Sequence, residues 1–262
     1  SLMPFLWEIG NKEGCLIGNR HKKSKMEVAN GIWKSYAGYS EMLCGVADDE
    51  HIFDNRKKLN PNRSVLELAD ACSEYKNEVA AVASWDVFPY ILNYRRSQLP
   101  IDYKSRHMVS AQVRCDSVTL NRALKTLGEK HPKLLFVEFC ETDFYGHHGK
   151  WNEYLNAAHQ NDAFIRKLWQ YCQNDEFYKG NTTFIITCDH GRGKSLGLHI
   201  NRGEVDPAAS WTEHGQHIAG SNQTWLVAFG KDIQHLGEVE GGKTIYTKQI
   251  APTIASILNV PF

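Results

Sequence analysis

Short apolar runs alternate along the chain with stretches whose apolar residues recur at helical spacing. Four runs have the length and composition of buried strands: residues 79–83, 134–140, 183–187 and 225–229. Helical patterns are found at residues 65–69 (the opening of a helix), 117–127 with Ser117 as its N-cap, 151–169 and 246–258. Strands that alternate with helices predict an α/β fold, in which a mostly parallel central sheet is covered by helices on both faces.

Composition narrows the class of protein. With 262 residues and 42% apolar content, the chain can bury a large core, most simply as one domain, although two small domains are compatible with the same length. Thirty basic and thirty acidic side chains cancel, so no overall field attracts nucleic acid or an anionic membrane. No apolar stretch is long enough to span a bilayer. Seven scattered cysteines without a CxxC pair argue against a disulfide framework and a thiolate zinc site.

Carboxylates and imidazoles follow the predicted strands, where α/β sheets bind their ligands. The candidates are Asp143 and His147 after residues 134–140, Asp189 and His190 after residues 183–187, and His214 before residues 225–229. Oxygen and imidazole donors without thiolate suit zinc, with manganese and iron as competitors. One such segment alone is most simply a turn with a capping aspartate. Three such segments together favour a metal site.

Residues 35–45 provide a candidate nucleophile, since they form a loop that turns into a short helix. A Ser35 hydroxyl near a helix N-terminus is placed to attack an electrophile and to bind an anion. The alternative is that Ser35 is a simple helix cap.

Other polar residues near these motifs have weaker claims. His148 is adjacent to His147 and is expected to point elsewhere, whereas His199 and His217 lie close to the motifs, with His217 as the replacement should His214 not be a ligand. Residues 84–90 with Arg95 and Arg96 either line a substrate pocket or pack in the interior.

Taken in order, these motifs resemble the alkaline phosphatase superfamily, in particular its nucleotide pyrophosphatase/phosphodiesterase-like, sulfatase-like and phosphomutase-like hydrolases. Residues 3–14 resemble the family's early helix, residues 35–45 its nucleophile segment, and residues 247–255 its closing helix. The resemblance covers residues 3–262 and implies an alkaline phosphatase-like fold with two metal ions at the carboxyl end of the sheet.

The resemblance also implies roles for individual residues. Ser35 takes the place of the nucleophile and binds a metal, and Asn55, twenty residues later, takes the place of a phosphoryl-oxygen-binding asparagine. Ala37 stands where the family often has proline. The implied ligands are Asp143, His147 and His214 for one ion, and Asp189, His190 and Ser35 for the other. The implied cofactors are two divalent ions, zinc or manganese.

The implied activity is hydrolysis of a small-molecule phosphodiester or phosphomonoester through Ser35. Alternatives are a sulfatase, a phosphomutase, or a catalytically impaired member that acts as a binding module. The sulfatase is disfavoured because residues 35–39 lack the proline and arginine of the sulfatase C/S-x-P-x-R segment. No nucleic-acid or membrane partner is expected.

One departure from the family concerns the start of the chain. Family members begin with a strand that ends in a metal-binding aspartate, whereas residues 1–13 contain no aspartate. We therefore expect residues 1–262 to form a single hydrolase domain that is shortened at its N-terminus. The ion at Asp189 and His190 would keep three ligands and bind more weakly. Backbone edges left unpaired by the missing strand would favour a homodimer.

Overall fold

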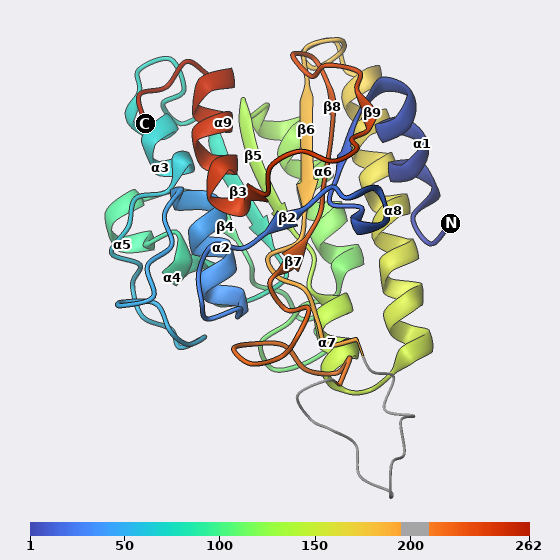
Figure 1. Cartoon of the computed structure of the whole chain (residues 1–262). Coiled ribbons are helices and arrows are strands. Elements are labelled where there is room, and N and C mark those ends of the chain that lie inside the picture. The colour runs from blue at the N-terminus through green and yellow to red at the C-terminus, as the bar shows by residue number, and fades with distance from the viewer. Residues whose placement is uncertain (195–209) are drawn as a thin grey trace, which may run out of the picture.

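The computed structural model describes residues 1–194 and 210–262 (Figure 1). The strands are β1 (Gly14–Ile17), β2 (Met26–Glu27), β3 (Val79–Ala83), β4 (Ile101–Asp102), β5 (Leu134–Glu138), β6 (Thr183–Thr187), β7 (Gln223–Thr224), β8 (Leu226–Gly230), β9 (Gly237–Glu238) and β10 (Ile245–Tyr246). The α-helices are α1 (Pro4–Glu13), α2 (Ser35–Cys44), α3 (Val65–Ala71), α4 (Phe88–Ile91), α5 (Tyr94–Ser97), α6 (Asp116–Lys130), α7 (Glu141–His147), α8 (Trp151–Asn174) and α9 (Ile250–Ile257). Two 3₁₀ turns are η1 (Arg20–Lys22) and η3 (Thr247–Gln249). Within the described residues, no helix combines the length and the apolar character needed to cross a bilayer.

The strands of residues 1–194 and 210–262 form three hydrogen-bonded groups. In the order β4-β3-β5 all strands are parallel, whereas in the order β6-β8-β1-β9 strand β8 runs antiparallel to both of its neighbours. A small third group has the order β10-β2-β7. The fold is therefore mixed α/β, and the expectation of a mostly parallel sheet is wrong for the half that contains β8. Antiparallel strands need no helical crossover, and the described part of the β6–β8 connection contains no helix.

Helices cover both faces of the sheet, as Figure 1 shows. The alternation of side chains along β3 determines which helices it meets. Val79, Ala81 and Ala83 pack in one core with residues of α2, α3 and α9. Val82 points the other way, into a core built with α6 and α8. Because β3 is buried on both faces, its sequence is continuously apolar, as the sequence pattern predicted.

Most predicted elements have their expected places, but some boundaries moved. Strand β6 and the start of α8 agree with the sequence pattern, and α8 continues to Asn174. Helix α6 is preceded by Cys115, which makes no side-chain cap, so Ser117 is not its N-cap. Strand β8 begins one residue later than predicted, at Leu226.

Two buried carboxylates hold the N-terminal part of the chain in place. Glu41 of α2 is fully buried and accepts hydrogen bonds from the amides of Ala29 and Asn30 and from the Thr247 hydroxyl. Asp162 of α8 accepts from the amides of Phe5 and Leu6, at 2.9 and 2.8 Å. A carboxylate that accepts several hydrogen bonds fixes its partners firmly. Glu41 thereby fixes the loop that leads into α2, and Asp162 fixes the first turn of α1.

Candidate active site

Helix α7 presents the first two predicted metal ligands on one face. It begins shortly after β5 ends, and the four-residue spacing of Asp143 and His147 places them one helical turn apart. Asp143 Oδ2 lies 3.5 Å from His147 Nε2. The pair therefore stands at the carboxyl end of β5, where the sequence pattern predicted it.

His214 reaches the same point from the loop before β7. Its Nε2 lies 2.9 Å from His147 Nε2 and 3.7 Å from Asp143 Oδ1. Its Nδ1 is 3.1 Å from the carbonyl of Trp33, and donation there leaves Nε2 with a lone pair. One ligand atom from each of the three side chains lies within 4.8 Å of the others. Because metal–nitrogen bonds are about 2 Å long, this spacing fits a shared cation.

Ser35 faces a second pair of predicted ligands. It is the first residue of α2, and Lys34, which makes no side-chain cap, occupies the N-cap position, so Ser35 is not the cap. Ser35 Oγ lies 3.0 Å from His190 Nε2, and His190 Nε2 lies 3.2 Å from Asp189 Oδ2. The close approach depends on Gly38, because a Cβ there would lie 2.3 Å from the Asp189 carbonyl oxygen. The structure thus brings Ser35, Asp189 and His190 together.

The two groups of residues adjoin each other. The rings of His190 and His214 stack with their centroids 3.8 Å apart. One cavity is lined by Ser35, Asn55, Asp143, His147, Asp189 and His190. The three segments that the sequence singled out, far apart in the chain, therefore meet in one place.

Asn55 lies beside the start of α2. Its Oδ1 accepts a hydrogen bond from the amide of Tyr36 at 3.0 Å. With the oxygen engaged in this way, the amide nitrogen of Asn55 is the group that it can offer to an anion.

Burial and charge set the protonation states around the cavity. Burial lowers the pKa of His190 and the pKa of His214 to about 4, so both rings are neutral at neutral pH, as metal ligands must be. Burial, together with the nearby charge of Asp143, raises the pKa of Asp189 to about 7. A buried carboxylate whose ionisation is disfavoured by a neighbouring negative charge is a place that a cation would stabilise.

Arg192 is a site residue that the sequence analysis missed. Its Nη2 forms an ion pair with Asp143 and donates to the Asp143 carbonyl at 3.0 Å, and its Nη1 donates to the Thr212 carbonyl at 2.8 Å. Although burial alone would raise it, the pKa of Asp143 is lowered by Arg192 and by the surrounding histidines. Gly146 makes room for the guanidinium, because a Cβ there would lie 2.6 Å from Arg192 Cζ. The position of Arg192 just after Asp189-His190-Gly191 was the available signal.

His148 and His217 belong to neither group of ligands, although His148 lines the cavity. His148 is exposed, and its Nδ1 lies 2.7 Å from the Phe144 carbonyl. His217 is exposed. His214, and not His217, lies beside Asp143 and His147. His199 falls outside the described residues.

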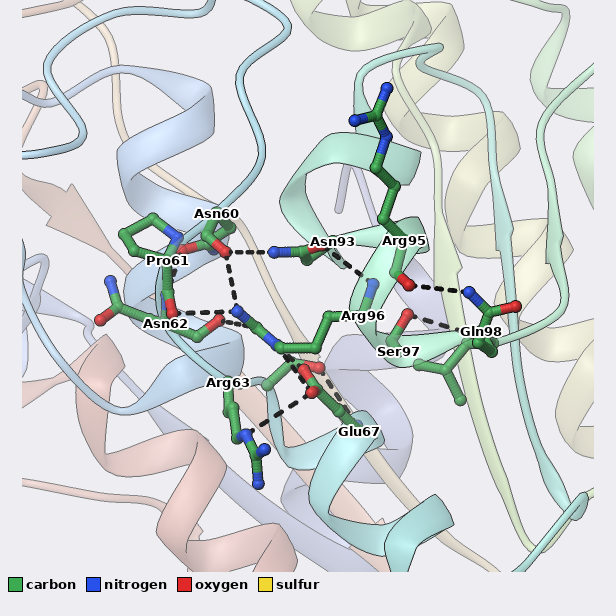
Figure 2. A network of polar contacts seen from close by, with 12 residues as sticks. Asn60, Pro61, Asn62, Arg63, Glu67, Asn93, Arg95, Arg96, Ser97 and Gln98 are labelled. Carbon is green, nitrogen blue, oxygen red and sulfur yellow. Dashed lines mark hydrogen bonds and ion pairs between the residues drawn. The ribbon is translucent and has the colours of Figure 1, made fainter.

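The suggested substrate pocket is largely scaffold. Arg96 pairs with Glu67 and donates to the backbone carbonyls of residues 60–62, as Figure 2 shows. Arg95 contacts the Tyr94 hydroxyl, and Phe88 is fully buried. Within residues 84–90, Trp85 and Val87 do line the cavity. Arg96 therefore binds a loop to helix α3, and packing is the better interpretation of this segment.

Solved structures with a similar fold come from several kinds of protein. The match to the lipoteichoic acid synthase LtaP from Listeria monocytogenes covers 100% of this chain and 67% of the LtaP chain, with a TM-score of 0.68 and 12% sequence identity. A sulfatase from Bacteroides thetaiotaomicron VPI-5482, whose function is assigned only provisionally, matches 100% of this chain and 66% of its own, with a TM-score of 0.67 and 11% identity. The alkaline phosphatase of the Antarctic bacterium TAB5 matches 98% of this chain and 91% of its own, with a TM-score of 0.59 and 13% identity.

Sequence comparison gives one family and one curated relative. A 2,3-bisphosphoglycerate-independent phosphoglycerate mutase from Gracilaria tenuistipitata var. liui is 30% identical over 69 residues, which are 26% of this chain and only 12% of the mutase. The family model described as the metalloenzyme superfamily matches residues 97–259, a span that contains Asp143, His147, Asp189, His190 and His214. The chain therefore belongs to the metalloenzyme superfamily, and its fold is alkaline phosphatase-like.

Proposed function

We propose that this chain is a metal-dependent hydrolase of small phosphate esters, diesters or monoesters, with Ser35 as its nucleophile. The observation that carries the proposal is the place of the Ser35 hydroxyl: it lies 3.0 Å from His190 Nε2, in the cavity that Asp143 and Asp189 also line. Membership of a metalloenzyme superfamily supports a requirement for divalent cations.

The donor sets fit two cations. Asp143, His147 and His214 would hold one ion, and Asp189, His190 and Ser35 would hold a second ion with one fewer nitrogen donor. Imidazole and carboxylate donors suit zinc, with manganese as the alternative; one variant of the TAB5 alkaline phosphatase holds magnesium. When bound, the ions would supply positive charge to the serine oxygen and to the leaving oxygen.

The chain's own residues position the attacking group. His190 Nδ1 lies 2.9 Å from the Gly191 carbonyl, and donation there leaves the Nε2 lone pair facing the Ser35 hydroxyl, with which it would share a cation. This arrangement orients Oγ, which gives up its proton to solvent and forms a bond to phosphorus. The bond from phosphorus to the ester oxygen breaks, and the leaving oxygen takes up a proton from water and departs as the alcohol. Water then cleaves the phosphoserine and regenerates the hydroxyl.

Groups around Ser35 can stabilise the phosphoryl oxygens. Asn55 offers its amide nitrogen, and α2 directs the positive end of its dipole toward the cavity. Donors placed where negative charge develops contribute strongly to phosphoryl transfer. Hydrolysis of a sulfate ester is the second candidate, because a sulfatase is among the structures with this fold.

A panel of four p-nitrophenyl esters tests the proposal: the phosphate, the bis-phosphate, the phenyl phosphonate and the sulfate, each with added zinc or manganese. We expect turnover of at least one phosphorus ester and loss of that turnover with EDTA. Turnover of the sulfate alone would identify a sulfatase. No turnover of any ester by a metal-loaded, folded protein would favour a binding module and contradict the proposal.

A further inference from the structure

Helix α7, which carries Asp143 and His147, is too short to hold its own position. It has seven residues, and Cys140 at its N-cap makes no side-chain cap within the described structure. Helices of this length are marginal in water, and their first amides need acceptors from elsewhere. Metal ligands must be held within about 0.5 Å of their working positions. The geometry of the site around Asp143 therefore depends on what fixes the start of α7.

The carboxylate of Asp116, the first residue of α6, accepts hydrogen bonds from the start of α7. Its Oδ1 accepts from the Cys140 amide at 2.8 Å, and its Oδ2 accepts from the Glu141 amide at 3.0 Å. In return, Glu141 Oε1 accepts from the Asp116 amide at 3.1 Å. The starts of α6 and α7 thus cap each other. Because both oxygens of the Asp116 carboxylate are used, the direction of α7 is tied to that side chain.

Asp116 is itself anchored to the parallel strands. It is buried, and Ser84, which follows β3, donates its hydroxyl to Asp116 Oδ1 at 2.7 Å. The Ser84 hydroxyl lies 2.7 Å from the Thr119 hydroxyl, which accepts from Arg114 Nε at 2.8 Å. Arg114 is fully buried and forms an ion pair with Asp102 of β4. A buried polar network whose members are satisfied is rigid. The contacts therefore continue from β3 and β4 to the first turn of α7.

We propose that Asp116 is the positioning residue for the metal ligands of α7. By holding the first amides of the helix, it determines where Asp143 and His147 meet His214. The inference rests on the proposed metal site, and it gives that site a residue that belongs to neither group of donors. Residues that orient metal ligands without touching the metal commonly change its affinity by about 10- to 100-fold.

Asp116→Asn is the substitution that tests this role with the least change of shape. An asparagine side chain has one acceptor oxygen and one NH₂ group, whereas both amides at the start of α7 are donors. One of these amides must then face another donor. The start of α7 loses one hydrogen bond while the volume of the side chain is kept.

Isothermal titration with zinc measures the effect. Burial raises the pKa of Asp116 to about 7, so the titration is done at pH 8, where the carboxylate is largely ionised. All proteins carry Asp189→Asn, which removes the carboxylate of the second group of donors. We expect Asp116→Asn to weaken zinc binding by about 10-fold or more. Asp162→Asn is the matched control, because Asp162 is also buried and accepts from two amides, but these belong to α1. It should leave the affinity unchanged.

The visible absorption spectrum of cobalt bound in place of zinc gives a second readout. This spectrum depends on the positions of the ligands around the ion, and a loss of overall stability does not change it once the site is saturated. We expect a changed spectrum in Asp116→Asn and the wild-type spectrum in Asp162→Asn.

Each other outcome also decides the proposal. Equal zinc affinity in Asp116→Asn and in the protein without it overturns the proposal, and so does equal weakening in Asp116→Asn and Asp162→Asn. If Asp116→Asn does not fold, Ser84→Ala removes a single donor to the carboxylate: weakening by several-fold supports the proposal, and unchanged affinity overturns it. No zinc binding by the wild type would contradict the proposed function as well, since Asp116 would have no ligands to position.

Discussion

The two halves of the candidate site differ in how completely the described chain builds them. Around Asp143, three side chains bring nitrogen and oxygen donors within 4.8 Å of one another. Around Asp189, His190 Nε2 lies 3.2 Å from the Asp189 carboxylate and 3.0 Å from the Ser35 hydroxyl, and Asp189 lines the cavity. The first half rests on a helix and a loop that are both in place. The second half has one fewer nitrogen donor, so we expect a cation to bind there more weakly.

The largest effect should come from Ser35. Ser35→Ala removes the attacking oxygen, so we expect kcat for a phosphate ester to fall by about 10³-fold or more, while cation binding at Asp143 is preserved. Ser40→Ala is the matched control, since Ser40 is a buried serine of the same helix that contacts Asn60 rather than the cavity. If Ser35→Ala and Ser40→Ala had equal turnover, Ser35 would not be the nucleophile.

The first half of the site can be tested with two adjacent histidines. His147→Ala should weaken zinc binding by about 100-fold, because it deletes one of three donors, whereas His148→Ala should leave binding unchanged. Isothermal titration with zinc measures both affinities. Equal affinities in the two variants would show that α7 does not provide the ligands.

Replacing Arg192 should strengthen zinc binding, which is the opposite of the effect expected for His147→Ala. Its guanidinium competes with a cation for Asp143, so Arg192→Ala should tighten zinc binding by several-fold, in line with the modest strength of partly exposed ion pairs. Arg106→Ala removes the same charge from an exposed position and serves as the control. Weaker zinc binding in Arg192→Ala would mean that Arg192 orients Asp143 instead of competing for it.

The smallest effect concerns Glu138, which lines the same cavity as Asp189. Burial, reinforced by the charge of Asp116, raises the pKa of Glu138 to about 8. A carboxyl whose pKa is higher in the folded state stabilises the fold at low pH, and this stability is lost as the pH rises toward 8.

Glu138→Gln should therefore show a smaller decrease in the free energy of unfolding between pH 5 and pH 8 than the wild type. Urea titrations at the two pH values measure this difference. Glu129→Gln, on an exposed face of α6, is the control. A pH dependence identical to the wild type would place the ionisation of Glu138 outside this range.

Local sequence patterns predicted the parts of the site that local geometry determines. The spacing of Asp143 and His147 predicts one helical face, and the apolar run before Asp189 predicts a strand that delivers it. Long-range pairing was not predictable in the same way: the antiparallel β8 follows from its partners β6 and β1. Arg192 was missed because its role depends on Asp143, far away in sequence.

The most direct test of the central claim is anomalous diffraction from crystals soaked in zinc. The account predicts a strong anomalous peak between Asp143, His147 and His214, and a weaker peak, or none, at Asp189 and His190 in the chain that begins at Ser1. A stronger peak at Asp189 and His190, or no peak between the first three side chains, would contradict it.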